Sequence, residues 1–233
     1  MLKAVLFDLD GTLLPMNEDK FTKGYFKLLS EYLYPMGYDK EKLIENVWAG
    51  TKCMLKNDGL HTNEEVFWNY FASVYGEDKL KNKDDFDNFY ITDFKKTKTF
   101  CRNNIFAKEI INTIRELGLK TILVSNPVFP LNGMLTRLSF VNLKANDFDY
   151  ITSYESSHYC KPNKEFYEEV LKINNLKPDE VIYFGNSEVE DYLPATNCNI
   201  QTYLVGNCTN ISDLSNIKVI NYIDILKIIN SIL

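Results

Sequence analysis

The sequence lacks the features that mark disulfide-bonded, zinc-binding and nucleic-acid-binding proteins. Its five cysteines are an odd number and form no CxxC pair, which argues against a disulfide framework or a zinc knuckle and predicts free thiols in a reducing compartment. The formal net charge is −6 and no basic patch occurs, so nucleic acid and anionic membrane surfaces are not expected partners. The two histidines, His61 and His158, belong to no ligand pattern and are given no role.

Long apolar runs are also missing, and none approaches the length needed to cross a membrane. Met1 leads directly into an apolar stretch at residues 4–7, which leaves no room for a signal peptide. We therefore expect a cytoplasmic protein with no membrane partner. The sequence leaves monomer and homodimer open.

What the chain does contain is enough apolar material for a large core. Hydrophobic residues make up 45% of the 233 residues, and the chain is longer than one average domain. From about residue 104, helical periodicity alternates with short apolar runs, which predicts an α/β core with a parallel sheet. The expected strands are residues 4–7, 121–124, 150–152, 181–184 and 202–205, and a closing helix is expected over residues 223–233.

The first expected strand is separated from the others by a long helical segment. Residues 16–100 are predicted to be helical throughout, so we expect a core of residues 1–15 and 101–233 and an inserted α-helical cap domain of residues 16–100. Within the insertion, Thr62 to Glu65 form a capping-box pattern. The helix that follows is expected to end at Gly76 and to bury Val66, Phe67, Tyr70, Phe71 and Val74.

The insertion is rich in aromatic residues, including Trp48 and Trp68. Two interpretations stay open. Packing inside a small helical bundle is the simpler one, and a pocket for a flat substrate is the other.

Polar residues follow the apolar runs at the points where the expected strands end. Ligands bind at the carboxyl ends of the strands in open parallel sheets, so we expect these residues to meet at one edge. They are Asp8 and Asp10 after the first run, Ser125 and Asn126 after the second, Glu155 and Lys161 after the third, and Asn186 and Asp191 after the fourth.

This set of residues suits phosphoryl transfer. A phosphate monoester carries about two negative charges near neutral pH and repels an attacking carboxylate unless cations neutralise its oxygens. A magnesium ion held by carboxylates would do this, and Lys161 would add a positive charge. The sequence thus favours an enzyme that acts on a small phosphorylated substrate.

These residues resemble the four motifs of the haloacid dehalogenase-like (HAD) superfamily, in the right order. The matching segments are Asp8-Leu9-Asp10-Gly11-Thr12-Leu13, Ile122-Leu123-Val124-Ser125-Asn126, Lys161-Pro162, and Phe184-Gly185-Asn186-Ser187 through Asp191. The resemblance covers residues 1–15 and about 104–205. It implies a Rossmann-like core of three α/β/α layers with a helical cap that closes over the substrate.

The resemblance also implies a role for each matching residue. Asp8 would be the nucleophile that forms an aspartyl-phosphate, and Asp10 the general acid and then the general base. Ser125, Asn126 and Lys161 would bind the phosphate. The Mg²⁺ cofactor would be held by Asp8, Asp10, Asp191 and Asn186.

Asn186 departs from the family pattern, which usually has an acidic residue at that position. A neutral carbonyl oxygen binds magnesium more weakly than a carboxylate does. Three functions therefore stay open. The leading one is a magnesium-dependent phosphatase of a small phosphorylated metabolite, and the alternatives are a dehalogenase or phosphomutase on the same scaffold and a weakly active or non-catalytic relative. Asp10 favours the phosphatase over the dehalogenase, since a dehalogenase has no alkoxide leaving group to protonate.

Overall fold

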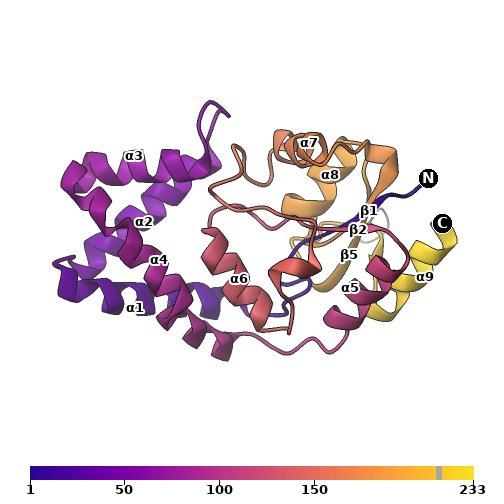
Figure 1. Ribbon diagram of the computed structural model, residues 1–233, viewed down its shortest axis with the longest axis horizontal. Coiled ribbons are helices and arrows are strands. Elements are labelled where there is room, and N and C mark those ends of the chain that lie inside the picture. Colours follow the sequence, from indigo (N-terminus) through magenta and orange to yellow (C-terminus); the bar gives the residue numbers. More distant parts are fainter. Residues whose placement is uncertain (214–216) are drawn as a thin grey trace.

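A six-stranded parallel sheet lies at the centre of one half of the molecule. The computed structural model describes residues 1–213 and 217–233 (Figure 1). The strand order is β3-β2-β1-β4-β5-β6. The strands are β1 (Ala4–Phe7), β2 (Lys120–Leu123), β3 (Tyr150–Ile151), β4 (Val181–Ser187), β5 (Gln201–Thr209) and β6 (Val219–Ile220). The predicted parallel α/β core is confirmed, and β1 pairs with both β2 and β4 in the middle of the sheet.

The helices divide between the sheet and the other half of the molecule. In Figure 1, α1 to α4 form the left half, α6 lies near the middle, and α5, α7, α8 and α9 lie around the sheet on the right, where both chain ends also lie. The helices are α1 (Glu18–Leu33), α2 (Lys40–Leu55), α3 (Asn63–Tyr75), α4 (Lys83–Ile91), α5 (Ala107–Glu116), α6 (Leu131–Ser139), α7 (Lys164–Ile173), α8 (Leu193–Asn197) and α9 (Tyr222–Ile232). A 3₁₀ segment, η3 (Asp93–Phe100), ends the helical half, and one π-helical turn, η6 (Glu188–Tyr192), follows β4.

The central strand is apolar at every position because helices cover both faces of the sheet. Successive side chains of a strand point to opposite faces. Ala4 and Leu6 belong to the same buried cluster as residues of α7 and α8. Val5 and Phe7 belong to the cluster that contains residues of α5 and α9. All four side chains of β1 are fully buried.

The predicted capping box at the start of α3 is confirmed. The Thr62 hydroxyl accepts a hydrogen bond from the Glu65 amide at 3.2 Å, and the Glu65 carboxylate accepts one from the Thr62 amide at 2.9 Å. The helix ends at Gly76, also as predicted, with φ of +92°. Phe67 and Phe71 are buried as expected, but Val66 and Tyr70 are only half-buried. The expectation that Val74 is buried was wrong, because Val74 is 45% exposed.

The buried stripe of α3 explains this difference. The buried residues of the helix are Asn63, Phe67, Trp68, Phe71 and Ala72. The stripe therefore turns toward Trp68 and Ala72, one residue beyond the expected positions, and leaves Val74 on the outer side of the last turn.

Aromatic rings fill the interior of the helical half. The ring of Tyr25 on α1 meets the rings of Phe94 and Phe129 edge-on, with centroids 5.8 Å and 5.4 Å apart. Since Phe129 follows β2, this packing joins the helical half to the sheet half. The buried cluster is continuous from α1 to α4 through the loop after β1 to the face covered by α5 and α9.

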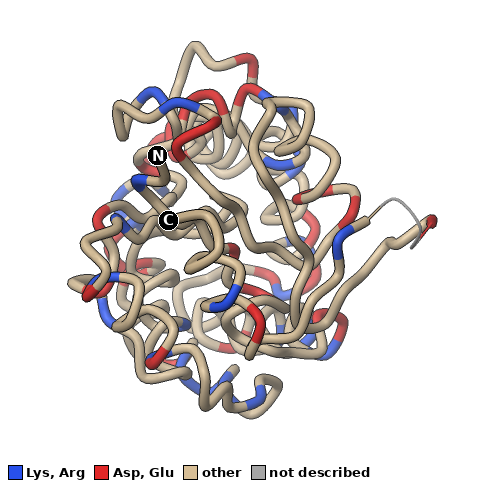
Figure 2. Tube along the Cα trace, turned by 90° about the vertical axis from the view of Figure 1, so that its right-hand side faces the viewer, with Lys and Arg blue, Asp and Glu red and all other residues tan. Residues whose placement is uncertain are grey.

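Charged residues of both signs are interspersed along the chain trace when the molecule is viewed from its end (Figure 2). In the part of the chain that the structure describes, no helix has both the length and the apolar character of a membrane span.

Truncation of a buried side chain of β1 tests this account of the core. Leu6 is fully buried, so Leu6→Ala is expected to lower the free energy of unfolding by about 2–5 kcal/mol in urea denaturation. The matched control is Leu60→Ala, because Leu60 is 78% exposed; its effect should be within about 0.5 kcal/mol. Equal losses in the two variants would contradict the central position of β1.

Candidate active site

The loop after β1 brings the first carboxylates to the carboxyl edge of the sheet. The Asp8 amide donates a hydrogen bond to the Phe184 carbonyl at 2.9 Å, so Asp8 still follows the path of the strand. The chain then turns at Gly11, whose φ is +83°. A side chain at this position would collide with Asn186, so the glycine permits the loop after β1 to approach the end of β4.

Lys161 lies between two carboxylates inside the protein. Its ammonium donates hydrogen bonds to Asp8 Oδ1 at 2.7 Å, to Asp191 Oδ1 at 2.6 Å and to the Tyr183 hydroxyl at 2.9 Å. Burial alone would lower the pKa of Lys161, but the charges of Asp191 and Asp8 outweigh burial and raise the pKa well above its ordinary value. The ammonium therefore stays charged and holds the ends of β1 and β4 together.

Asp8 is buried in surroundings that make its ionisation costly. Burial raises the pKa of Asp8 from 3.8 to about 7, although the charge of Lys161 opposes this shift, and the nearby carboxylates of Asp191 and Asp10 add to it. The Thr12 hydroxyl donates a hydrogen bond to Asp8 Oδ2 at 3.1 Å. The group is thus poised to change charge near neutral pH.

Both oxygens of Asp191 are engaged by donors from the protein. Oδ1 accepts from Lys161 and, at 2.5 Å, from the Tyr183 hydroxyl. Oδ2 accepts from the amides of Asn186 and Ser187, both at 2.9 Å. Burial, the largest influence, raises the pKa of Asp191, but Lys161 and these hydrogen bonds together lower it.

The expectation that Asp191 is a metal ligand stays a prediction. Its carboxylate lies at the predicted edge of the sheet and accepts hydrogen bonds from four donors, which tie it to Lys161 and to the turn after β4. Gly185 is needed beside it, because a side chain there would overlap the Asp191 carboxyl group. Among the residues that the structure describes, no group of three or more His, Cys, Asp or Glu side chains is placed to hold a metal ion.

Asn186 uses its amide group as both donor and acceptor. Its Oδ1 accepts from the Thr12 hydroxyl at 3.3 Å, and its Nδ2 donates to the Asn207 carbonyl at 2.9 Å. Asn207 in turn donates from its side chain to the Met16 carbonyl at 3.1 Å. A carboxylate could not donate to Asn207, so the neutral side chain fits the local hydrogen bonds.

Asp10 pairs with an arginine that the sequence analysis missed. The guanidinium of Arg137, on α6, donates to Asp10 Oδ2. Arg137 is fully buried and lies over the ring of Phe129, 4.3 Å from its centroid. Asp10 Oδ1 is buried and accepts no hydrogen bond within the described residues. Arg137 therefore fixes the direction of the Asp10 carboxylate.

The residues after β2 and β3 complete this edge of the sheet. Ser125 is buried, and in the described part of the chain its hydroxyl makes no hydrogen bond, although its carbonyl accepts one from the Thr152 hydroxyl at 2.7 Å. Asn126 Oδ1 accepts from the Lys161 amide at 3.3 Å. Glu155 lies apart from this group and instead accepts hydrogen bonds from the Leu131 amide at the start of α6, at 3.0 and 3.1 Å.

These residues form the floor of a cavity of about 290 Å³ between the sheet edge and the helical half. The predicted site residues on its lining are Asp8, Asp10, Ser125, Asn126, Lys161, Asn186 and Asp191. Two further carboxylates also line it, Glu18 on α1 and Glu190 on η6. Acidic side chains outnumber cationic ones here, so a phosphate group would need an additional cation.

Known proteins share this sequence pattern and fold. Residues 5–205 match the family model described as haloacid dehalogenase-like hydrolase. A haloacid dehalogenase-like hydrolase domain-containing protein 3 from Xenopus laevis is 24% identical over 99 residues, which are 42% of this chain and only 39% of that protein. The pyrophosphatase PpaX of Halalkalibacterium halodurans is 26% identical over 88% of this chain and 84% of its own length.

A solved structure agrees with this assignment at the level of the fold. A HAD family enzyme from Bacteroides thetaiotaomicron, in complex with magnesium and inorganic phosphate, superposes with a TM-score of 0.55 at 18% identity, over 91% of this chain and 98% of that one. Because the family model spans most of the sequence and the sheet has the expected parallel order, the chain belongs to the haloacid dehalogenase-like hydrolase family.

Proposed function

We propose that the protein is a magnesium-dependent phosphatase that hydrolyses a small phosphate monoester through an aspartyl-phosphate on Asp8. The observation that carries this proposal is the buried hydrogen-bonded set of Asp8, Lys161 and Asp191 beneath the cavity. An aspartate held beside a fixed ammonium can approach a phosphate dianion that an isolated carboxylate would repel.

The proposed reaction has two steps. An Asp8 carboxylate oxygen attacks phosphorus, the ester P–O bond breaks, and the leaving alkoxide takes a proton from Asp10. Water then attacks phosphorus and gives a proton to Asp10, which releases phosphate and restores the Asp8 carboxylate. Ser125 donates a hydrogen bond to the phosphoryl oxygens, and Lys161 offsets their charge.

Asp10 supports a phosphatase over a dehalogenase, because only an alkoxide leaving group requires a proton. Arg137 would serve by keeping the Asp10 carboxylate aimed at the cavity, which Asp10 lines. Asn126, which bonds the Lys161 amide, would act on the phosphate indirectly by holding the Lys161 backbone.

Magnesium is the cofactor that the donor atoms around Asp8 suit. The Asp8 carboxylate, the Asn186 carbonyl oxygen and the main-chain carbonyl of Asp10 are hard oxygen donors, and the cavity floor carries excess negative charge. These groups would hold the ion, and Asp191 would support them by fixing the turn that carries Asn186. When bound, magnesium would neutralise the phosphate oxygens.

We also propose that residues 16–100 act as a cap over the cavity. The two chain segments that join this region to the core run side by side, since Met16 and Cys101 form an antiparallel bridge and the Arg102 amide bonds the Pro15 carbonyl at 2.7 Å. Such a paired crossing suits a hinge about which a cap opens for substrate and closes to exclude water.

Replacing the proposed nucleophile tests the function directly. Asp8→Asn is expected to lower kcat for p-nitrophenyl phosphate by at least about 1,000-fold, because an amide cannot attack phosphorus. The matched control is Asp19→Asn on the exposed first turn of α1, which should retain full activity. Borohydride added during turnover should convert Asp8 of the wild type to homoserine, as seen by peptide mass spectrometry. A loss of kcat in Asp8→Asn well below about 1,000-fold would contradict the proposal.

The raised pKa of Asp8 predicts how stability depends on pH without metal. The group has a pKa of about 7 when folded against an ordinary value of 3.8, so its contribution to stability is complete below the lower value and is lost as the pH rises through about 7. Asp8→Asn removes this loss. The Tm of Asp8→Asn minus the Tm of the wild type should therefore be larger at pH 8 than at pH 5, by at least about 4 °C in EDTA. About 1 kcal/mol shifts the Tm of a protein of this size by about 2–4 °C.

Thermal unfolding monitored by circular dichroism at several pH values measures this difference, with Asp19→Asn as the control that should follow the wild type. A Tm difference between Asp8→Asn and the wild type that stays constant with pH would show that Asp8 does not titrate in this range.

The variant Asn186→Asp tests whether the neutral side chain at this position weakens magnesium binding, as a weakly active relative would require. The new carboxylate would face the Asn207 carbonyl, 2.9 Å from the present amide nitrogen, so the variant should be less stable than the wild type in EDTA. Magnesium should bind it about 10-fold more tightly and raise its Tm more than that of the wild type. Isothermal titration with Mg²⁺ measures the affinity, and an unchanged affinity would remove Asn186 from the proposed metal site.

A further inference from the structure

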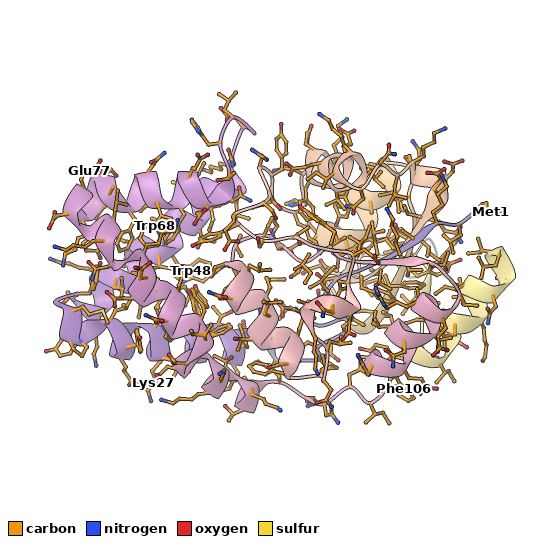
Figure 3. All side chains as sticks on the ribbon, viewed as in Figure 1. Met1, Lys27, Trp48, Trp68, Glu77 and Phe106 are labelled. Carbon is orange, nitrogen blue, oxygen red and sulfur yellow. The ribbon has the colours of Figure 1, made fainter. Side chains whose placement is uncertain are left out.

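Aromatic side chains make up most of the cavity wall that the helical half provides. They come from α1, α2, α3 and α4, with further rings from the segments after β2 and β3, and Figure 3 labels Trp48 and Trp68 in the helical half. The aromatic lining residues include Tyr25, Phe26, Trp48, Trp68, Tyr90 and Tyr154. Simple packing of the helical bundle accounts for buried rings, but it does not explain why these rings face the space above the candidate nucleophile.

Among the described residues, this wall provides no positive charge for a second anionic group of a substrate. Lys161 is the only Lys or Arg among the described residues that line the cavity, and its ammonium already bonds Asp8 and Asp191 on the floor. A bisphosphate, a pyrophosphate or a phosphorylated carboxylic acid would bury its second negative charge against apolar rings. Burying an unpaired charge costs several kcal/mol, which excludes these compounds as good substrates.

The polar groups of four aromatic residues on the wall are occupied by one another. The Tyr25 and Tyr90 hydroxyls form a hydrogen bond at 2.9 Å, and the Trp68 indole donates to the Tyr154 hydroxyl at 3.4 Å. A sugar hydroxyl that loses water in this cavity would find few free partners. The wall therefore behaves as an apolar surface and disfavours polyhydroxylated substrates.

Among the aromatic residues that line this cavity, Trp48 is the most exposed. It is 42% exposed, and the centroid of its ring lies 5.1 Å from that of Phe26. A substrate ring placed against Trp48 would cover apolar surface that now contacts water.

From the aromatic lining, the missing second cation and the paired hydroxyls, we propose that the substrate is a phosphate monoester of an alcohol that carries an uncharged aromatic ring system. This inference rests on the proposed phosphatase function and names the substrate class of the same site. The cavity volume of about 290 Å³ limits the ring system to one or two rings beside the phosphate. Substrate specificity comes from burial of the substrate's ring against the aromatic wall, while the residues of the cavity floor hold the phosphate.

Substrates with equally poor leaving groups provide the test. Benzyl phosphate, methyl phosphate and glucose 6-phosphate all release an alkoxide, so differences in kcat/KM report binding of the alcohol portion. We expect kcat/KM for benzyl phosphate to exceed that for glucose 6-phosphate by at least about 100-fold, and pyrophosphate and fructose 1,6-bisphosphate to be poorer still. A preference for glucose 6-phosphate or for either doubly charged compound would overturn the inference and leave the phosphatase proposal intact.

Two variants locate the preference in the cavity wall. Trp48→Ala should lower the ratio of kcat/KM for benzyl phosphate to that for methyl phosphate by about 10-fold, because covering the ring is lost. Tyr34→Ala is the matched control, since Tyr34 is 59% exposed and does not line the cavity, and it should leave the ratio unchanged. An unchanged ratio in Trp48→Ala contradicts the inference.

Binding of a non-hydrolysable probe separates the two proposals. Benzylphosphonate in the presence of Mg²⁺ should change the tryptophan fluorescence of the wild type and bind at least about 10-fold more tightly than methylphosphonate. If no ester is hydrolysed but this binding preference is seen, the phosphatase proposal fails and the assignment of the cavity stands. If both phosphonates bind equally, the cavity assignment fails whatever the turnover.

Discussion

The buried ammonium of Lys161 is the interaction on which the site depends. Removing an ammonium from water is costly, and this cost is offset only because Asp8 and Asp191 meet it from the ends of two neighbouring strands. The small residues Gly11 and Gly185 permit the close approach of the segments that surround it. The parallel sheet thus places the charged residues that follow the apolar strand β1 beside those that follow the neighbouring strand.

A second ion pair, buried on its Arg137 side, connects this centre to the helical half. Arg137 reaches Asp10 from α6, and the neighbouring Thr136 donates a hydrogen bond to the Tyr90 carbonyl of α4 at 2.8 Å. One turn of α6 therefore touches both the carboxylate proposed for proton transfer and a helix of the proposed cap. Tyr90 lines the aromatic wall and Asp10 lines the charged floor, so one helix contacts both parts of the cavity lining.

The sequence was most informative where local pattern and topology agree. The apolar runs at the strands and the polar residues after them predicted which side chains meet, because the carboxyl ends of parallel strands share one edge. Helix α6 was missed, since its short segment contains Gly133 and follows Pro127 and Pro130. The two-residue strand β6 was too short to give a pattern, and Arg137 looked like any polar residue. Contacts such as Arg137 with Asp10 depend on tertiary packing, which no local spacing encodes. The sequence also did not indicate that four hydrogen-bond donors would surround the Asp191 carboxylate.

The bridge between Met16 and Cys101 has a consequence for how such a protein can change over evolutionary time. Because the chain leaves the core and returns to it at neighbouring points, the distance between these points does not depend on the length or the fold of the segment between them. Helices can be added to this inserted segment, lost from it or exchanged in it without shifting the strands that carry the reactive groups. Selection can thus alter which molecule is recognised while the chemistry is inherited unchanged.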